Sequence, residues 1–313
     1  MSRLRIAVLG GGRSSEHEVS LASAASVAQT LDPARYEATV VTLPRDGGFD
    51  LATLPRTADV VFPVLHGPFG EDGTVQGLLE LAGIPYVGSG VAASAVCMDK
   101  DLCKAVLRDR GITVARSVTL LSGDPVAHSF AYPVFVKPAS LGSSVGITKV
   151  AESSALAAAV AEARLHDEKV LIEEHQPGVE VECSVLGNAE PVASPVGEIV
   201  AHRDWYDFEA KYAEGGMELV VPARIDAATT VRVQEQAVAA FRATGCEGMA
   251  RVDCFVRPDG EVVVNEINTI PGFTQTSVYA RLFAAGGIPY GELLDRLVEL
   301  ALERHARRAR LAY

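Results

Sequence analysis

The stretch that decides the fold is Arg251-Val-Asp-Cys-Phe-Val-Arg-Pro-Asp-Gly-Glu-Val-Val-Val-Asn-Glu-Ile-Asn268. Two apolar, β-branched runs flank Asp259-Gly260, a dipeptide that predicts a β-hairpin with a two-residue turn. Such a turn sets the register of the whole hairpin, because Pro258 then faces Glu261.

Four polar side chains share one face of the hairpin in this register. Asp253 faces Glu266 and Arg251 faces Asn268, because side chains alternate along a strand. Like charges at directly opposed positions destabilise a sheet, so the two carboxylates require a cation. Hard oxygen ligands of this kind suit Mg²⁺, which binds one or two carboxylates together with substrate phosphates. A solvated acidic face is the alternative, but the apolar residues of the opposite face favour a metal site: Val252, Cys254 and Val256.

The composition narrows the class of protein. The 313 residues, 48% of them hydrophobic, are enough for two or three domains with their own cores. No apolar run approaches the ~20 residues of a membrane helix, and the first residues read as a strand rather than a signal peptide. The net charge of −12 argues against nucleic-acid binding, and the basic tail Arg304–Arg310 reads as the end of a helix. Five cysteines without a C-x-x-C pattern fit a reducing cytoplasm.

Strand and helix patterns alternate along the chain, which predicts an α/β protein. Residues 1–96 are expected to form an open sheet of parallel strands with helices. Residues 97–178 and 179–313 are expected to form two further units, separated by the chain-breaking Gln176-Pro-Gly178. Ser15-x-x-Glu18 has the capping-box pattern that opens a helix.

The glycines Gly10-Gly-Gly12 stand between a predicted strand and a predicted helix, as in a dinucleotide-binding loop. The fingerprint fails, because Ser15 occupies the place of its third glycine and no acid ends the second strand. Glycines before a helix can still let an anion approach the free N–H groups. From spacing alone, Glu18 is a capping residue rather than a substrate ligand.

Four further segments are candidate site loops. The loop from His66 to Gly73 follows a strand, where ligands bind in open sheets, although its acids Glu71 and Asp72 read as helix N-terminal acids. Lys137 ends a strand before a Gly/Ser-rich loop that suits a polyphosphate or, equally, is a surface turn. Residues 204–212 fit either a lid or a packed loop, and residues 265–277 could hold a carboxylate or an oxyanion.

Taken in order, these motifs resemble the D-alanine–D-alanine ligases of the ATP-grasp superfamily. The resemblance spans nearly the whole chain and rests on Gly10-Gly-Gly with His17-Glu-Val-Ser20, His66-Gly-Pro-Phe-Gly-Glu-Asp-Gly73, Met98-Asp-Lys100, Val136-Lys-Pro138, Gly142-Ser-Ser-Val-Gly146, Tyr206-Asp-Phe-Glu-Ala-Lys-Tyr212, Arg251-Val-Asp253, and Asn265-Glu-Ile-Asn268 with Pro271-Gly272. It implies a three-domain ATP-grasp architecture, with an N-terminal open parallel α/β sheet and two α+β domains that clasp ATP.

The resemblance also implies a nucleotide and metal site. Two Mg²⁺ ions, which Mn²⁺ could replace, would bind Asp253, Glu266 and Asn268. The phosphates of ATP would be held by Lys100, Lys137 and Lys211, the last at the γ-phosphate. Adenosine would be contacted by Glu173, Glu174 and Glu180.

Two D-alanine sites are implied in the same way. Glu18 would bind the ammonium of the first D-alanine beside His66, against the capping interpretation drawn from spacing. Ser143 and Tyr212 would close a lid onto Glu18. Arg251 would stabilise oxyanions, and the second D-alanine would lie at Gly272 and Ser277.

The implied reaction joins two D-alanine molecules through an acyl phosphate, with release of ADP and phosphate, for peptidoglycan precursor synthesis. Within this chemistry a D-alanine–D-lactate ligase or another ATP-grasp carboxylate–amine ligase is the alternative, although Tyr212 favours an amine over a hydroxyl as nucleophile. An oxidoreductase and a non-catalytic nucleotide-binding regulator are alternatives of other classes. A cytoplasmic homodimer is expected, although the sequence itself does not reveal the oligomeric state.

Overall fold

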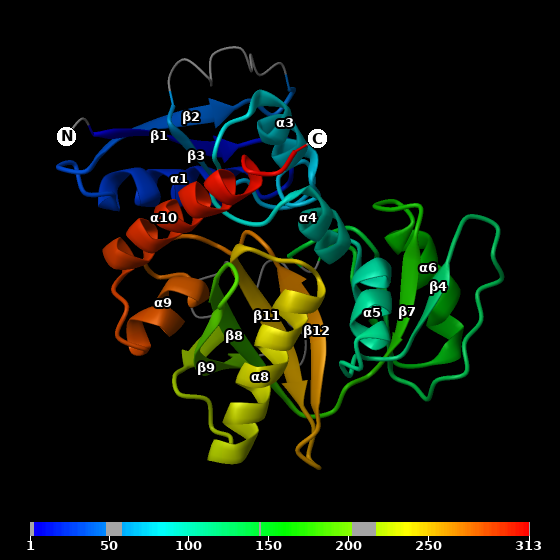
Figure 1. Ribbon diagram of the computed structural model, residues 1–313. Helices are drawn as coiled ribbons and strands as arrows, with labels where there is room; N and C mark the ends of the chain where they lie inside the picture. The colour runs from blue at the N-terminus through cyan, green and yellow to red at the C-terminus, as the bar shows by residue number, and fades with distance from the viewer. Residues whose placement is uncertain (1–2, 48–57, 144, 202–216, 313) are drawn as a thin grey trace.

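The computed structural model describes residues 3–47, 58–143, 145–201 and 217–312 (Figure 1). Its first unit is the open parallel sheet that the sequence predicts, in the order β2-β1-β3. The strands are β1 (Leu4–Gly11), β2 (Tyr36–Leu43) and β3 (Val60–Pro63). The helices that follow β1 and β3 are α1 (His17–Thr30) and α3 (Thr74–Ala82).

The second unit is an antiparallel sheet in the order β4-β7-β5-β6. Its strands are β4 (Ser117–Leu120), β5 (Val134–Pro138), β6 (Thr148–Val150) and β7 (Val170–Glu174). A 3₁₀ turn at Ser153–Ala155 leads into α6 (Leu156–Ala163), which packs its apolar side on the sheet.

The third unit is a larger antiparallel sheet in the order β10-β9-β8-β11-β12. Its strands are β8 (Val179–Gly187), β9 (Val192–Ala201), β10 (Met217–Val220), β11 (Gly248–Val256) and β12 (Val262–Asn268). Helix α8 (Ala227–Ala243) lies across this sheet, and its Val233 and Phe241 share a core with Val252 and Cys254 (Figure 1).

Helix α5 (Lys100–Asp109) connects the two antiparallel sheets. It follows α4 (Val91–Met98), and Asp99 caps it by accepting the N–H groups of residues 101 and 102. Its Cys103 and Leu107 are buried in the core of the third unit, although the chain order places the helix before the second unit. Figure 1 shows α5 between β12 and β7.

The C-terminal helices return to the first unit. After α9 (Val278–Ala285), helix α10 (Tyr290–Arg308) buries Leu293 and Leu297 in one core with Val8 and Phe62 of the parallel sheet (Figure 1). The sequence assigned these residues to the third unit, because helix periodicity shows that a face is buried but not what buries it. None of the helices in the described ranges is long and apolar enough to cross a bilayer.

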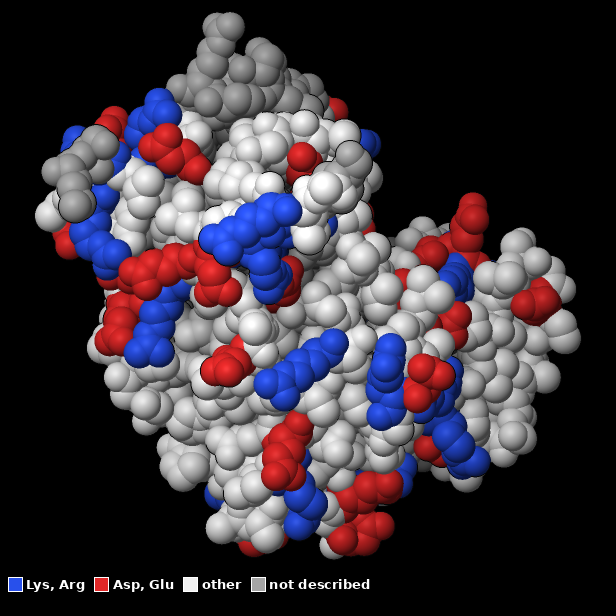
Figure 2. Space-filling model, viewed as in Figure 1, with Lys and Arg blue, Asp and Glu red and all other residues white. Residues whose placement is uncertain are grey.

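The basic tail is the end of a helix, as predicted. Arg307 and Arg308 lie in the last turn of α10 and form ion pairs with Glu247 and Glu80. On the face shown in Figure 2, basic side chains are interspersed with acidic ones in the same way.

Two details of the predicted elements were wrong. The capping box does not form: α1 begins at His17, its N-cap position is Glu16, and among the described residues no side-chain hydrogen bond caps it. Strands β4 and β9 were not predicted. Strand β4 is only four residues long, and β9 contains Pro195 and Gly197, which weaken a strand pattern.

Candidate active site

The hairpin of β11 and β12 has the predicted pairing at its polar end, but its loop and its register near the turn differ from the prediction. Near the turn Val256 pairs with Val262, and the N–H of Arg257 bonds to the carbonyl of Glu261. The loop therefore has three residues instead of two, and the register beside it differs by one residue from the prediction.

A β-bulge restores the predicted register further along. Without it, Asp253 would face Asn265; the bulge adds Asn265 to β12, so that Asp253 faces Glu266 and Arg251 faces Asn268. A shift of one residue would exchange the two faces of the strand. Because the bulge restores the register, the four polar residues lie on one face as predicted.

Cations of the protein compensate the facing acids of this hairpin. Arg251 donates two hydrogen bonds to Asp253, both of 2.7 Å, and its Nε lies 2.9 Å from Glu182. Burial lowers the pKa of Arg251, but Asp253 and Glu182 outweigh it, so the pKa lies well above its ordinary value. Lys100 lies 3.6 Å from Glu266, and Asn268 donates to Asp253 at 3.0 Å.

A cleft of about 270 Å³ opens in front of this face and receives residues from all three units. Eight of the sixteen residues that the sequence proposed for the site line it: His66, Ser143, Glu180, Arg251, Glu266, Asn268, Gly272 and Ser277. The sequence did not single out Glu16 and Glu182, which also line it. Lys211 and Tyr212 lie outside the described residues.

The structure places Glu16, not Glu18, at the cleft. Glu18 is 77% exposed and forms an ion pair with Arg45 at 2.9 Å, outside the cleft wall formed by the described residues. Glu16 is buried, and Ser143 donates its hydroxyl to Glu16 rather than to Glu18. The Ser14 hydroxyl ties the backbone of this segment to the His66 loop, because it donates to the carbonyl of His66 and accepts the N–H of Glu16.

Glu71 is a cleft residue that the sequence treated as a helix-terminal acid. It accepts the N–H groups of Gly67 and Ile270 at 2.8 and 3.0 Å, and burial raises the pKa of Glu71 to about 8. Its neighbour Asp72 has the expected local role, since it accepts the N–H groups of Phe69 and Thr74. The spacing could not separate the two acids, because they are adjacent in one loop.

His66 has a fixed orientation beside these acids. Its Nδ1 lies 3.0 Å from the carbonyl of Ile270 and therefore donates to it, while Nε2 lies 3.1 Å from the Ser23 hydroxyl. Burial lowers the pKa of His66, which keeps the ring neutral. Ser277 is held by Thr274, whose N–H it accepts at 3.0 Å.

The acids proposed to contact adenosine already have basic partners. Glu173 is 2% exposed and lies 2.6 Å from Lys137 and 2.8 Å from Lys104. Burial raises the pKa of Glu173, but the two lysines outweigh it and lower the pKa to about 2. Glu174 forms an ion pair with Arg116 at 2.6 Å. Contact of either acid with adenosine stays a prediction, whereas their pairing with these cations was not foreseen.

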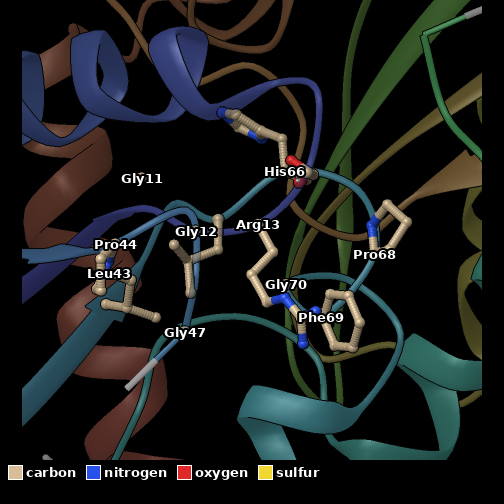
Figure 3. A pocket seen from close by; sticks show the side chains of 12 residues that line it. Gly11, Gly12, Arg13, Leu43, Pro44, Gly47, His66, Pro68, Phe69 and Gly70 are labelled. Carbon is tan, nitrogen blue, oxygen red and sulfur yellow. Dashed lines mark hydrogen bonds between the residues drawn. The ribbon is translucent and has the colours of Figure 1, made fainter. Parts of the chain in front are cut away.

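The glycine loop after β1 has no free N–H groups for an anion at its last two positions. The N–H of Gly11 donates to the Ser20 hydroxyl at 2.9 Å, and the N–H of Gly12 donates to the carbonyl of Leu43 at 2.8 Å. Beside the loop is a separate, mainly apolar cavity of about 140 Å³, where the guanidinium of Arg13 lies over the Phe69 ring (Figure 3). These two N–H groups are therefore not available to an anion, and approach of an anion to the N-terminus of α1 stays a prediction.

The donor set of the hairpin fits Mg²⁺. Asp253, Glu266 and Asn268 present two carboxylates and an amide oxygen, which are hard ligands. Within the described ranges no group of three or more His, Cys, Asp or Glu side chains is arranged to hold a metal ion. The hairpin set thus depends on Asn268 and on further oxygen ligands such as phosphate.

The fold and the site together define a ligase of the ATP-grasp class, with two antiparallel sheets that meet at a cleft lined by glutamates and Arg251. Family models for the D-ala D-ala ligase C-terminus and N-terminus match residues 106–299 and residues 5–55 and 44–89. D-alanine–D-alanine ligase A of Mesorhizobium japonicum is 45% identical over 98% of this chain and 99% of its own, and that of Escherichia coli K12 is 42% identical over 98% of each.

Solved structures agree with these matches. The D-alanine–D-alanine ligase of Coxiella burnetii has a TM-score of 0.88 at 37% identity and covers 99% of this chain and 97% of its own. The VanG D-Ala:D-Ser ligase of Enterococcus faecalis has a TM-score of 0.88 at 38% identity, over 96% and 100%. The chain belongs to the D-alanine–D-alanine ligase family, which confirms the predicted family and fold class.

Proposed function

We propose that this chain joins two D-alanine molecules into D-alanyl-D-alanine at the expense of ATP. One observation carries the proposal: a single cleft collects an inward carboxylate from the first unit, a hydroxyl-bearing loop from the second and the polar face of the hairpin from the third. Such a cleft can hold two amino acids and a triphosphate in contact, which is the requirement for ATP-driven peptide bond formation.

The first step activates a carboxylate. A carboxylate is a poor electrophile, so its oxygen attacks the γ-phosphate and yields an acyl phosphate and ADP. Lys100 and Lys137 are proposed to hold the phosphates, together with Lys211, because ammonium groups stabilise the charge of phosphoryl transfer. Bound Mg²⁺ or Mn²⁺ supplies further charge neutralisation, and Asp253, Glu266 and Asn268 would hold it.

The second step forms the peptide bond. The amine of the second D-alanine attacks the acyl carbonyl, a tetrahedral oxyanion forms, and inorganic phosphate leaves. Arg251 is proposed to stabilise that oxyanion, because Asp253 and Glu182 fix its guanidinium at the cleft wall. Ser277 and Gly272 are proposed to receive the carboxylate of the second D-alanine.

The ammonium of the first D-alanine is proposed to bind Glu16 rather than Glu18. Glu16 is the buried carboxylate of this segment, and it stands at the cleft with Ser143 and His66. Tyr212 and Ser143 are proposed to close the site over Glu16, which would keep water from the acyl phosphate.

A cytoplasmic location and a homodimer are part of the proposal. All five cysteines are free and buried, which supports a reducing compartment. The dimer is tested by the molar mass of the protein in solution, measured by light scattering.

The deciding experiment is D-alanine-dependent release of phosphate from Mg·ATP, with the product identified by mass spectrometry. Parallel reactions with D-alanine plus D-lactate and D-alanine plus D-serine measure the choice of second substrate. We expect the dipeptide D-alanyl-D-alanine as the main product. An ester as the main product, or nucleotide binding without phosphate release, would contradict the proposal.

A further inference from the structure

Lys104 is a buried cation beside the nucleotide site that the reaction scheme above does not use. It is 1% exposed and lies on α5, one turn after Lys100, so the two lysines project from the same side of the helix. Its Nζ lies 2.8 Å from Oε2 of Glu173 and 3.4 Å from the backbone carbonyl of Asn265. A lysine is almost never buried to this extent without a specific partner.

The charges around Lys104 do not balance. Glu173 is the only acid within ion-pair distance of Lys104 or Lys137 among the described residues, and it contacts both, at Oε2 and Oε1 respectively. Two ammonium groups therefore share one carboxylate, and the cluster keeps one net positive charge. Lys137, which is 10% exposed, is the more accessible of the two lysines.

The same cluster also reaches the bulge of the hairpin. Asn265 receives contacts from both lysines at 3.4 Å, from Lys104 at its backbone carbonyl and from Lys137 at its side-chain oxygen. Asn265 is the residue that the bulge adds to β12, and it directly precedes Glu266. Lys104 thus touches the element that brings Glu266 opposite Asp253.

We infer that Lys104 is a positioning residue for the phosphates of the nucleotide. It occupies one oxygen of Glu173, so that the Lys137 ammonium keeps its charge for a phosphate instead of having it neutralised by a carboxylate. This inference rests on the proposed function, since it assigns a nucleotide to the cleft.

A purely structural role for Lys104 predicts different behaviour. In that case the pair Lys104–Glu173 stabilises the fold, and removal of both partners is at best neutral for nucleotide binding. Charge positioning predicts instead that binding follows the net charge of the cluster. That charge is +1 in the wild type, 0 in Lys104→Met, +2 in Glu173→Gln, and +1 again in the double variant.

The test is titration calorimetry of Mg·ADP into the full-length protein and these variants, with D-alanine-dependent turnover measured alongside. We expect Lys104→Met to weaken Mg·ADP binding about tenfold and the double variant to return most of the loss. The KM for D-alanine should stay unchanged. Arg108→Met, which removes an exposed charge one turn further along α5, is the control for general electrostatics and should bind normally.

Unchanged affinity in Lys104→Met, or a double variant as weak as Lys104→Met, would overturn the inference. If Lys104→Met does not fold, Lys104→Gln decides, because it keeps a polar side chain at this position and also sets the charge of the cluster to 0, so it should bind Mg·ADP about tenfold more weakly than the wild type. A wild type that fails to bind Mg·ADP would refute the proposed function itself. If the wild type binds Mg·ADP and shows D-alanine-dependent turnover, the proposed function holds, and a contrary result with the variants counts against the inference on Lys104 alone.

Discussion

The substitution Glu16→Gln, compared with Glu18→Gln, tests how the first D-alanine is held. The two acids are two residues apart and chemically identical, so the pair provides its own control. Glu16 is buried at the cleft and Glu18 is 77% exposed. Glutamine keeps the shape and the acceptor oxygen, so only the charge is removed.

The magnitudes differ because the two environments differ. A hydrogen bond to a charged group contributes about 1.5–3 kcal/mol, which corresponds to roughly 10- to 150-fold in affinity. We therefore expect Glu16→Gln to raise the KM for the first D-alanine by a factor in this range. The exposed ion pair of Glu18 with Arg45 contributes only about 0–1 kcal/mol to stability, and its loss should leave the kinetics of D-alanine unchanged.

Initial rates of phosphate release at saturating Mg·ATP, measured over a wide range of D-alanine concentration, separate the two substrate sites. Thermal unfolding of each variant checks that the fold is retained. If Glu18→Gln raises the KM for the first D-alanine more than Glu16→Gln does, our placement of the ammonium site is wrong.

Three other changes have defined outcomes. Glu266→Ala should abolish phosphate release and leave the unfolding temperature within a few degrees of the wild type, because it removes a proposed metal ligand at a partly exposed position; near-normal turnover would refute the metal assignment. The pKa of Glu173 is lowered to about 2 in the fold, so its stabilisation is present above its unfolded pKa of about 4.3 and is lost as the pH falls toward 2. Urea titrations should therefore show the stability advantage of the wild type over Glu173→Gln shrinking by about 2 kcal/mol between pH 6 and pH 3, and a constant difference would contradict the ionised pair. Leu297→Ala, in the core shared by α10 and the parallel sheet, should cost about 2–5 kcal/mol, measured as the change in free energy of unfolding; a loss below 1 kcal/mol would show that α10 is not part of that core.

The hairpin shows how far local rules reach in this chain. The turn rule gave the right partners for Asp253 and Arg251 only because two errors cancelled. The loop is one residue longer than Asp259-Gly260 suggests, and the bulge at Asn265 adds one residue back. The residue type of Asn265 does not predict a bulge. The register is selected instead by burial of the apolar face. A shift of the strand pairing by an odd number of residues would expose that face, so only an even shift is tolerated.

Site residues at the end of a predicted strand could be predicted from the sequence. Site residues whose position depends on a contact between distant segments of the chain could not. His66 follows a strand and lies at the cleft as expected, and Lys137 lies at the end of β5 beside Glu173. Glu16 lies two residues after Ser14, whose hydroxyl bonds to the carbonyl of His66, a contact between residues 52 positions apart that spacing does not show. Spacing alone favoured a capping box, because the local pattern fits one. The packing of α10 on the first sheet was beyond reach for the same reason.

The charge of the cleft itself argues for a divalent cation. Among the described residues its charged lining consists of five glutamates and one arginine: Glu16, Glu71, Glu180, Glu182, Glu266 and Arg251. Burial keeps Glu71 largely protonated at pH 7, since its pKa is about 8, and the lining still carries a net charge of −3. A triphosphate would be repelled from such a wall. The lysine cluster offsets only part of this charge, so divalent cations must bind together with the nucleotide. The hard oxygen ligands of the hairpin provide a site for these cations. On that reasoning ATP without Mg²⁺ should bind far more weakly than Mg·ATP, and the difference should narrow in Glu266→Gln.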